Sequence, residues 1–407
     1  MRISTQNLYT TSTNQLNSLQ SALARTQMQL SKNTRVLTPA DDPIASARAL
    51  EVSQSQSMNT QYATNRNSAN SALSAVESAL QNSGDLLQDI QQLAVKAGNP
   101  ALLPADREAL AVELEGKLED LLGVANTTDG SGGYLFSGYM TTTKPFDRTP
   151  EGANYQGDQG VRQLQVADSR KIPLSASGSA VFEAIPTGNG VFQTQAGENN
   201  KGAGIISSGS VVDRGALTNN PYTLSFSVTG DTPPVTTYSV VDTSISPARA
   251  VLTDQPYEAG KQISFEGLAF DIKGVPADDD TFSIEPSKKQ SVFTTVTDLV
   301  GALRAPADGS TGKADLTNKL STAIDNLKNA HENVLKVQAG VGAHMNELDY
   351  LESAGSDMDI QYSATMDDLT GLDMVKAISD FAMQQNTLQA AQMSFKTMSG
   401  LSLFNYL

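Results

Sequence analysis

The two ends of the chain carry apolar residues at intervals of seven within a polar, nearly uncharged sequence. The first series is Tyr9, Leu16, Leu23, Leu30 and Leu37, with Leu19 in a second row, and the last is Met374, Phe381, Leu388 and Phe395. A repeat of seven predicts a helix whose narrow apolar stripe is covered by another helix. Residues 1–40 contain no Asp or Glu, and residues 381–407 contain one charge, Lys396. Water-exposed helices usually carry charges opposite the stripe, so we expect these polar faces also to be covered, in an assembly.

Two more helices are predicted after the first. Asp41 and Asp42 stand before Pro43. Pro suits the first turn of a helix, and a preceding carboxylate can cap the free amides there. A carboxylate pair for acid–base chemistry is the alternative, but the flanking prolines favour capping. The predicted spans run from Pro43 to Gly98 and from Pro104 to about Asn126.

From Tyr134 to about Pro286 the apolar pattern changes to a period of two, which predicts strands. The clearest run places Tyr222, Leu224, Phe226 and Val228 between small polar residues. Shorter signals occur at Tyr238 and Val240, Ile263 and Phe265, Phe270 and Ile272, and Phe282 and Ile284. The middle of the chain is therefore expected to be β-rich, with several short strands and turns.

Helical spacing returns at Val292 and breaks between Pro306 and Gly312. The long helix expected next has an apolar stripe at Leu320, Leu327, Val334, Val341 and Leu348. We expect this helix to pause or bend around Gly355, before the last helix begins.

The simplest fold for this order of elements is α+β. Both chain ends form a long antiparallel helical coiled-coil rod, and a β-rich domain is inserted at its far tip. The predicted segments are a terminal helix at 1–40, the N-terminal part of the rod at 41–133, the inserted domain at 134–290, the C-terminal part of the rod at 291–360 and a terminal helix at 361–407. Residues 192–290 are a candidate sub-module.

Composition narrows the functional classes. The formal charge of −16 and a sequence pI of about 4.5 argue against binding to nucleic acid or to an anionic membrane surface. The chain contains no cysteine, which excludes disulfides and thiolate zinc sites. No apolar run is long enough to cross a bilayer, so membrane insertion is not expected. The N-terminus lacks the apolar core of a signal peptide, and any export would use another route.

Candidate catalytic and metal sites are few. The two histidines, His331 and His344, are too far apart for a helical metal pair, and we interpret His331 as a core residue with one satisfied nitrogen. The glycines at 202, 204 and 209 lack the lysine of a phosphate-binding loop and predict a linker. The acidic run from Asp278 to Asp280 lacks calcium-loop spacing and predicts a solvated turn. We therefore expect no enzymatic activity and no cofactor.

The apolar residues of the terminal helices are the predicted assembly interface. They are Leu16, Leu19, Leu23, Leu30, Met374, Ile378, Phe381, Leu388 and Phe395. A buried leucine contributes about 1.5–3 kcal/mol, whereas ordering each residue costs about 1–2 kcal/mol. A few seam residues cannot order so polar a helix alone. We therefore expect residues before Pro39 and after about Thr370 to be largely disordered in the free monomer and to fold on assembly.

Several segments, in order along the chain, resemble the bacterial flagellin-like axial proteins. They are Met1–Thr5, Thr38–Pro43, Tyr62 with Asn65, Asn126–Gly130, Tyr134–Tyr139, Pro145–Phe146, Met383–Gln385, Leu388–Ala390 and Ser402–Phe404. The segments from Asn126 to Phe146 point to subunits that join hook and filament rather than to flagellin. One departure is Asn33, where these proteins commonly have Gly in a turn. Because Asn tolerates a left-handed backbone well, we expect the turn to persist.

The resemblance implies a structural protein that is exported unfolded by the flagellar type III route. It would lie outside the cell, as a thin ring at the hook–filament junction. The partners it implies are copies of itself, hook-associated protein 1, flagellin and an export chaperone that shields the C-terminal helix. One alternative is flagellin itself. Another, from a different class, is a secreted type III effector or binding protein whose β domain recognises an external ligand.

Overall fold

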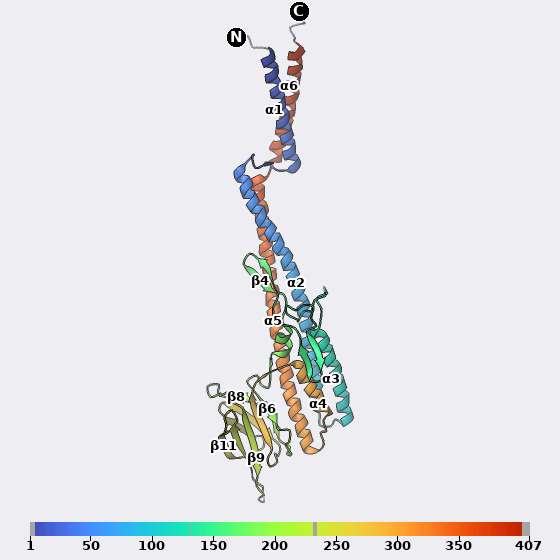
Figure 1. Cartoon of the computed structure of the whole chain (residues 1–407), viewed down its shortest axis with the longest axis vertical. Helices are drawn as coiled ribbons and strands as arrows, with labels where there is room; N and C mark the ends of the chain where they lie inside the picture. Colours follow the sequence, from blue (N-terminus) through green and yellow to red (C-terminus); the bar gives the residue numbers. More distant parts are fainter. Residues whose placement is uncertain (1–4, 131, 231–233, 401–407) are drawn as a thin grey trace, which may run out of the picture. The chain divides into compact units, whose positions relative to one another are not determined.

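The computed structural model describes residues 5–130, 132–230 and 234–400, and the chain divides into two compact units (Figure 1). Unit 1 comprises Met1–Arg66 and Asp349–Leu407, and unit 2 comprises Asn67–Leu348. Helices occupy both ends of the chain and strands occupy its middle, which confirms the predicted α+β class. Residues 1–4 of the first sequence motif and the whole of the last, Ser402–Phe404, lie outside the described residues.

The helices follow the predicted order. They are α1 (Thr5–Lys32), α2 (Pro43–Ala97), α3 (Pro104–Ala125), α4 (Val292–Arg304), α5 (Gly309–Thr370) and α6 (Met374–Gly400). The starts of α2 and α3 at proline agree with the sequence signals. Helix α1 is shorter than its heptad series, because Asn33 has a left-handed φ of 52° that ends the helix before Leu37.

The expectation that the helix pauses around Gly355 is wrong, since α5 runs through this residue without interruption. Gly355 instead allows the close approach of Arg66 from α2. The Arg66 side chain is 4% exposed, and its Nε lies 2.6 Å from the Glu352 carboxylate. A Cβ at Gly355 would overlap the Arg66 guanidinium, while the Gly355 carbonyl accepts a hydrogen bond from Asn59 Nδ2 at 2.7 Å. The glycine therefore makes room for a buried cation within unit 1.

The middle of the chain forms strands joined by turns, with one short π-helix, η1 (Ser179–Glu183). The strands are β1 (Phe146–Thr149), β2 (Gly152–Tyr155), β3 (Gln163–Ala167), β4 (Arg170–Pro173), β5 (Ile185–Pro186), β6 (Phe192–Ala196), β7 (Ile205–Ile206), β8 (Ser210–Val211), β9 (Tyr222–Val228), β10 (Thr236–Asp242), β11 (Arg249–Pro256), β12 (Gln262–Phe265), β13 (Leu268–Lys273), β14 (Thr281–Pro286) and β15 (Lys289–Gln290). Every strand signal named from the period of two lies in one of them.

Strands β6 to β14 build what we call the β module. A five-stranded sheet has the order β11-β10-β9-β14-β6, so β11 and β6 are its two edges. A second sheet has the order β12-β13-β7, with β8 also paired to β13. The core of the module includes the alternate residues Tyr222, Leu224 and Phe226 of β9, which confirms the interpretation of the period-two pattern.

A second core lies where α3 and α4 meet the first hairpin. The rings of Phe146, Phe182 and Phe293 pack with centroid separations between 4.9 and 5.7 Å. Phe136 lies edge-on to Phe182 at 5.5 Å. All four rings are fully buried, so this aromatic cluster fixes the segment after α3 against α4 within unit 2.

A row of asparagines on α5 holds the β module and the segment of chain that leads into it. Asn318 uses both ends of its carboxamide: it accepts from the Ile206 N–H and donates to the Gly204 carbonyl, both at 3.0 Å. Asn326, Asn329 and Asn333 bond at 2.8 Å to main-chain groups of Gly188, Pro186 and Val181, respectively. Hydrogen bonds to peptide groups thus attach both the module and the segment before it to α5.

The acidic turn at 278–280 differs from the solvated turn that we expected. Asp280 is 1% exposed, and its carboxylate accepts hydrogen bonds from the N–H groups of Lys201, Gly202 and Ala277 at 2.7–3.0 Å. A buried carboxylate needs such donors. Asp280 therefore joins the start of β14 to the loop before β7. Residue 202 has to be glycine in this joint, because a Cβ there would press on the Ala277 amide.

Candidate assembly interface

Helices α1 and α6 pair in unit 1 with opposite chain directions (Figure 1). Tyr9 packs on Phe395, with ring centroids 5.2 Å apart, and Thr26 lies beside Gln384. The contact of an early α1 residue with a late α6 residue, and of a later one with an earlier one, defines the antiparallel arrangement. The two heptad series of the sequence are therefore brought together.

The pair covers its own apolar stripe only in part. Leu16, Leu19, Leu23, Leu30, Phe381, Leu388 and Phe395 are half-buried, whereas Met374 and Ile378 are 42% and 55% exposed. Among the described side chains of the two helices, only Thr26 and Ala377 are buried. Two helices that meet along a narrow seam leave its flanks in water. The predicted interface residues thus retain apolar surface that further helices could cover.

A polar contact sits at the centre of this seam. Thr26, 8% exposed, donates from Oγ1 to Gln384 Oε1 at 3.0 Å and also lies 3.1 Å from the Ala22 carbonyl. Neither residue is among the interface positions predicted from the sequence. The signal was present, because Thr26 follows Leu19 by seven positions and Gln384 follows Ala377 by seven. A polar residue within an apolar row typically fixes the register of two helices.

The turn after α1 is fastened to the end of α5. Arg35 donates from its backbone N–H to the Thr370 carbonyl at 2.8 Å and from its guanidinium to the Leu369 carbonyl at 2.9 Å. Thr34 forms an isolated antiparallel bridge with Gly371. The left-handed Asn33 directs the chain into these contacts, so the turn joins both chain ends.

The two predicted capping carboxylates have different roles. Asp42 caps α2, since its Oδ1 accepts from the Ala45 N–H at 3.0 Å directly after Pro43. Asp41 instead closes the loop: its Oδ2 accepts from the N–H groups of Leu37 and Thr38 at 3.0 Å, and Oδ1 pairs with Arg25 at 2.6 Å. Backbone N–H donors lower the pKa of both carboxyl groups. A lowered pKa does not suit an acid–base pair at neutral pH.

Unit 1 exposes further large apolar side chains that lie outside the predicted interface. They are Ile44 and Leu50 on α2, Tyr350 and Ile360 on α5 and Val375 on α6, each at least 67% exposed. They lie off the regular stripes, so periodicity alone could not find them. Exposed apolar residues in such number are typical of a surface that contacts other protein chains.

Other chemistry has little support in the part of the chain that the structure describes. His331 is half-buried rather than a core residue, and its Nε2 lies 3.1 Å from Gln88 Nε2. The described His, Asp and Glu residues form no group of three or more that could hold a metal ion. None of the described helices combines the length and the hydropathy that a bilayer crossing requires.

The sequence and the fold match proteins of bacterial flagella. Residues 3–141 match the family described as bacterial flagellin N-terminal helical region. Flagellar hook-associated protein 3 of Escherichia coli (strain K12) is 29% identical over 404 residues, which cover 99% of this chain and 99% of that protein. The crystal structure of the flagellar junction protein FlgL from Legionella pneumophila has a TM-score of 0.72 and 31% identity. That match covers 80% of this chain and 100% of the Legionella chain.

Paired helices from both chain ends, a β region between them and the flagellin match define a flagellin-like axial protein. The flagellin of Salmonella montevideo is 25% identical over 348 residues, or 83% of this chain and 66% of that flagellin. The chain belongs to the flagellar hook-associated protein 3 family: the E. coli member matches over a greater length and at higher identity than this flagellin, and the Legionella junction protein is 31% identical. The resemblance drawn from the sequence motifs is therefore confirmed, and flagellin is the more distant relative.

Proposed function

We propose that this chain is a structural subunit that joins the hook of the bacterial flagellum to its filament. The E. coli relative is named a hook-associated protein and the Legionella structure a flagellar junction protein. The observation that carries the proposal is the half-covered seam between α1 and α6, whose remaining apolar surface neighbouring helices would cover. The family is structural, and we assign the chain no catalytic role.

The proposed interface comprises the seam residues predicted from the sequence. Leu23 and Phe395 represent its two sides, and Met374 and Ile378 extend it on the exposed face of α6. Neighbouring copies would cover these apolar positions and the polar faces beside them. Because the uncharged Ser, Thr, Asn and Gln side chains there carry no like charges, copies can approach without repulsion.

We further propose which proteins this subunit contacts and where in the flagellum it lies. Hook-associated protein 1 would lie on the hook side and flagellin on the filament side, with copies of this chain between them. An export chaperone would shield α6, whose Met383 and Met393 are 64% and 69% exposed. The subunit would reach its place outside the cell by type III export in an unfolded state. A chain without cysteine suits that passage, because no disulfide can form within it.

Localisation tests this proposal directly. Antibody against the β module, applied to isolated flagella, should label one narrow band at the end of the hook. Label along the whole filament would favour a flagellin, and absence of label would contradict any place in the flagellum. Deletion of the gene should abolish motility, whereas intact motility would favour the secreted effector or binding protein.

A further inference from the structure

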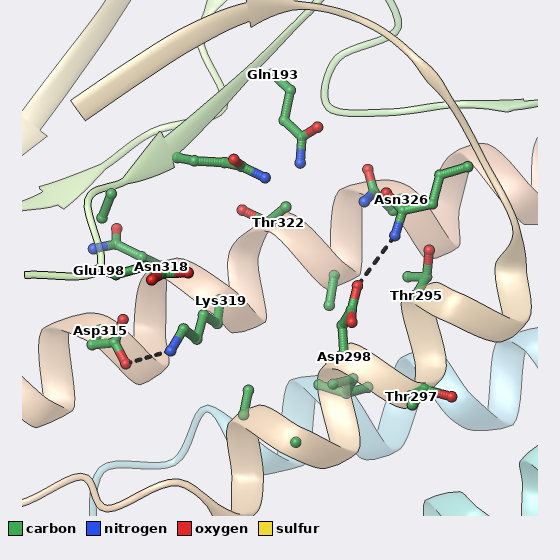
Figure 2. A pocket seen from close by; sticks show the side chains of 17 residues that line it. Gln193, Glu198, Thr295, Thr297, Asp298, Asp315, Asn318, Lys319, Thr322 and Asn326 are labelled. Carbon is green, nitrogen blue, oxygen red and sulfur yellow. Dashed lines mark hydrogen bonds and ion pairs between the residues drawn. The ribbon is translucent and has the colours of Figure 1, made fainter. Parts of the chain in front are cut away.

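A cavity of about 500 Å³ lies between strand β6 and helices α4 and α5 in unit 2 (Figure 2). Its volume is in the range of sites that hold ligands or short peptide segments. The terminal-helix interface does not involve it. Gln193 and Gln195 form one wall, and Thr322 and Asn326 belong to the opposite wall.

The two walls present rows of polar groups that face one another. Gln193 and Gln195 alternate along β6 with Phe192 and Thr194, which are buried on the other side of the strand. On α5, Asn318, Thr322 and Asn326 are spaced by four residues and so share one side of the helix. Figure 2 shows the Gln193 carboxamide directed from the strand toward this helix. A segment placed between the walls would meet donors and acceptors on both sides.

The rows suit the peptide groups of another main chain. A carboxamide both donates and accepts, as a peptide group does. Within the described residues, the side chains of Gln193, Gln195 and Thr322 form no hydrogen bond to protein. Their neighbours Asn318 and Asn326 already bond to main-chain groups, at Gly204 and Ile206 for Asn318 and at Gly188 for Asn326. The carboxamides of Gln193 and Gln195, which have no protein partner, are thus the same chemical group as the carboxamides of Asn318 and Asn326, which bind main chain.

Charge and shape restrict the segment that fits. Glu198, Asp298 and Asp315 line the cavity, and its one lysine, Lys319, is paired to Asp315 at 2.8 Å. This excess of carboxylates disfavours an acidic segment. The apolar side chains of the lining are all aliphatic, namely Ala196, Leu299, Ala302 and Ala323, and the lining contains no aromatic ring. An uncharged segment with small side chains and one aliphatic side chain matches these features.

The loop between β10 and β11 has this composition. Thr243–Ala248 reads Thr-Ser-Ile-Ser-Pro-Ala, and all six residues are exposed. Ile245 is 55% exposed. The loop contains no charge, and its hydroxyls and peptide groups can both donate and accept hydrogen bonds. Within one chain this loop joins β10 to the edge strand β11, while the cavity adjoins the opposite edge strand, β6.

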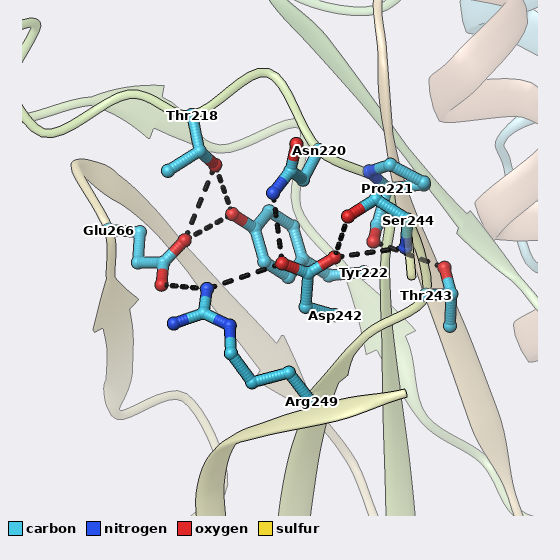
Figure 3. Close-up of polar contacts among 9 residues, drawn as sticks. All are labelled: Thr218, Asn220, Pro221, Tyr222, Asp242, Thr243, Ser244, Arg249 and Glu266. Carbon is cyan, nitrogen blue, oxygen red and sulfur yellow. Dashed lines mark hydrogen bonds and ion pairs between the residues drawn. The ribbon is translucent and has the colours of Figure 1, made fainter. Parts of the chain in front are cut away.

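The base of the loop is held by a buried carboxylate (Figure 3). Asp242 is 2% exposed and accepts from the Ser244 N–H at 2.9 Å, from the Ser244 hydroxyl at 2.6 Å and from Asn220 Nδ2 at 2.9 Å. Arg249 bridges Asp242 to Glu266, at 3.2 and 2.6 Å. A loop fixed at its base and free at its tip loses less conformational entropy when it binds.

We propose that the Thr243–Ala248 loop of one copy inserts into the β6–α5 cavity of the next copy, with Ile245 against the aliphatic patch. The inference rests on the proposed function, which supplies the ordered array of copies. Because the loop and the cavity adjoin opposite edges of one sheet, the contact is head-to-tail. Repeated contacts of this kind generate rings or helices rather than closed dimers.

Cysteine crosslinking tests the contact, since the chain has no native cysteine. One strain would express two forms together, one with Ser246→Cys in the loop and one with Thr322→Cys in the cavity. Mild oxidation of isolated flagella should give a disulfide-linked dimer that is absent from strains carrying either variant alone. Flagella that keep the antibody band but give no dimer, with both thiols open to maleimide, would overturn the proposal. Loss of the band from the parent protein would instead contradict the proposed function.

An aspartate substitution provides a second, independent measurement. Ile245→Asp should reduce the amount of subunit retained at the junction, because it places a charge in an acidic cavity. Val275→Asp, at a position 74% exposed elsewhere on the β module, is the matched control and should be retained like the parent. Equal retention of both variants would contradict the insertion of the loop.

Discussion

Thr26 and Gln384 lie 358 positions apart in the sequence and meet at 3.0 Å in the seam between α1 and α6. Their hydrogen bond is the polar contact at the centre of an otherwise apolar stripe. Its net contribution is about 0.5–1.5 kcal/mol, but a buried group left without its partner costs more, about 1–3 kcal/mol. Its main consequence is the choice of register, since any shift along the helices separates the pair.

The register role predicts a specific result for Thr26→Val combined with Gln384→Leu. Without the polar pair, several registers become similar in energy, although the seam is more apolar. A disulfide between Tyr9→Cys and Phe395→Cys, whose parent rings are 5.2 Å apart, reports the observed register. Its yield should fall in the double variant and persist with Thr26→Ser, which keeps the hydroxyl. An unchanged yield would mean that the apolar residues alone set the register.

A charge in the seam should block assembly without unfolding the β module. Leu23→Asp and Phe395→Asp each forfeit an apolar contact worth about 1.5–3 kcal/mol when fully buried and add the desolvation cost of a carboxylate. We expect both variants to be missing from isolated flagella in immunoblots, while the β module keeps its cooperative thermal unfolding. Val275→Asp again serves as the control. Normal incorporation of either seam variant would remove these residues from the interface.

The terminal helices should exchange their amide protons rapidly in the free monomer. Their half-covered seam offers little burial to offset the entropy of ordering two polar helices. Hydrogen exchange followed by mass spectrometry should show weak protection in α1 and α6 and strong protection in β9 and β14. Strong protection of both helices in the monomer would show that they fold before assembly.

Gly355→Ala should destabilise unit 1, although alanine is the better helix former. The added methyl group would press on the buried Arg66 guanidinium, an overpacking that typically costs about 1–3 kcal/mol. Gly340→Ala in the same helix has no atom within 4 Å of the new Cβ and should stabilise by up to about 1 kcal/mol. Urea denaturation of the two variants measures the difference. Equal stabilisation by both would indicate that Arg66 relocates without cost.

Acid should weaken the β module through Asp242. Hydrogen bonds from Ser244, Asn220 and Arg249 lower the pKa of Asp242 from 3.8 to about 2. Because the folded pKa lies below the unfolded value, the stabilisation is complete above about pH 4 and is lost as the pH falls toward 2. Asp242→Asn should flatten the dependence of stability on pH in this window. Asp279→Asn, at an exposed position, is the control and should retain the dependence of the parent.

Local sequence signals predicted most of the helices and strands. The roles of residues whose partners are distant in sequence could not be predicted. Pro43 and Pro104 mark helix starts because their effect on the backbone is local. The alternation of β9 was readable because one side of the strand faces a core. Gly355 was misread because its reason for being glycine, Arg66, is far away in sequence. Asp280 was taken as solvated for the same cause, since its donors at 201 and 202 are brought to it only by the fold.

In the assembly interface, too, local patterns could be predicted from the sequence and long-range pairings could not. Heptad spacing identified the two terminal helices and most of their seam, because the repeat is a property of each helix alone. Heptad spacing could not pair Thr26 with Gln384, because the register between two helices depends on both of them and cannot be derived from either one alone. Nor could it indicate the α5 asparagines as attachment points. An Asn on a helix is usually solvated, and here each finds peptide groups presented by a separate part of the chain.

The asparagine row on α5 has a consequence for sequence divergence. Asn318, Asn329 and Asn333 bond to carbonyl groups, which every residue type provides. Substitutions on the module's outward loops therefore leave these hydrogen bonds in place, and the module stays attached to the same helix. A joint of this kind lets the surface of the module change in sequence while the scaffold that carries it is conserved in structure.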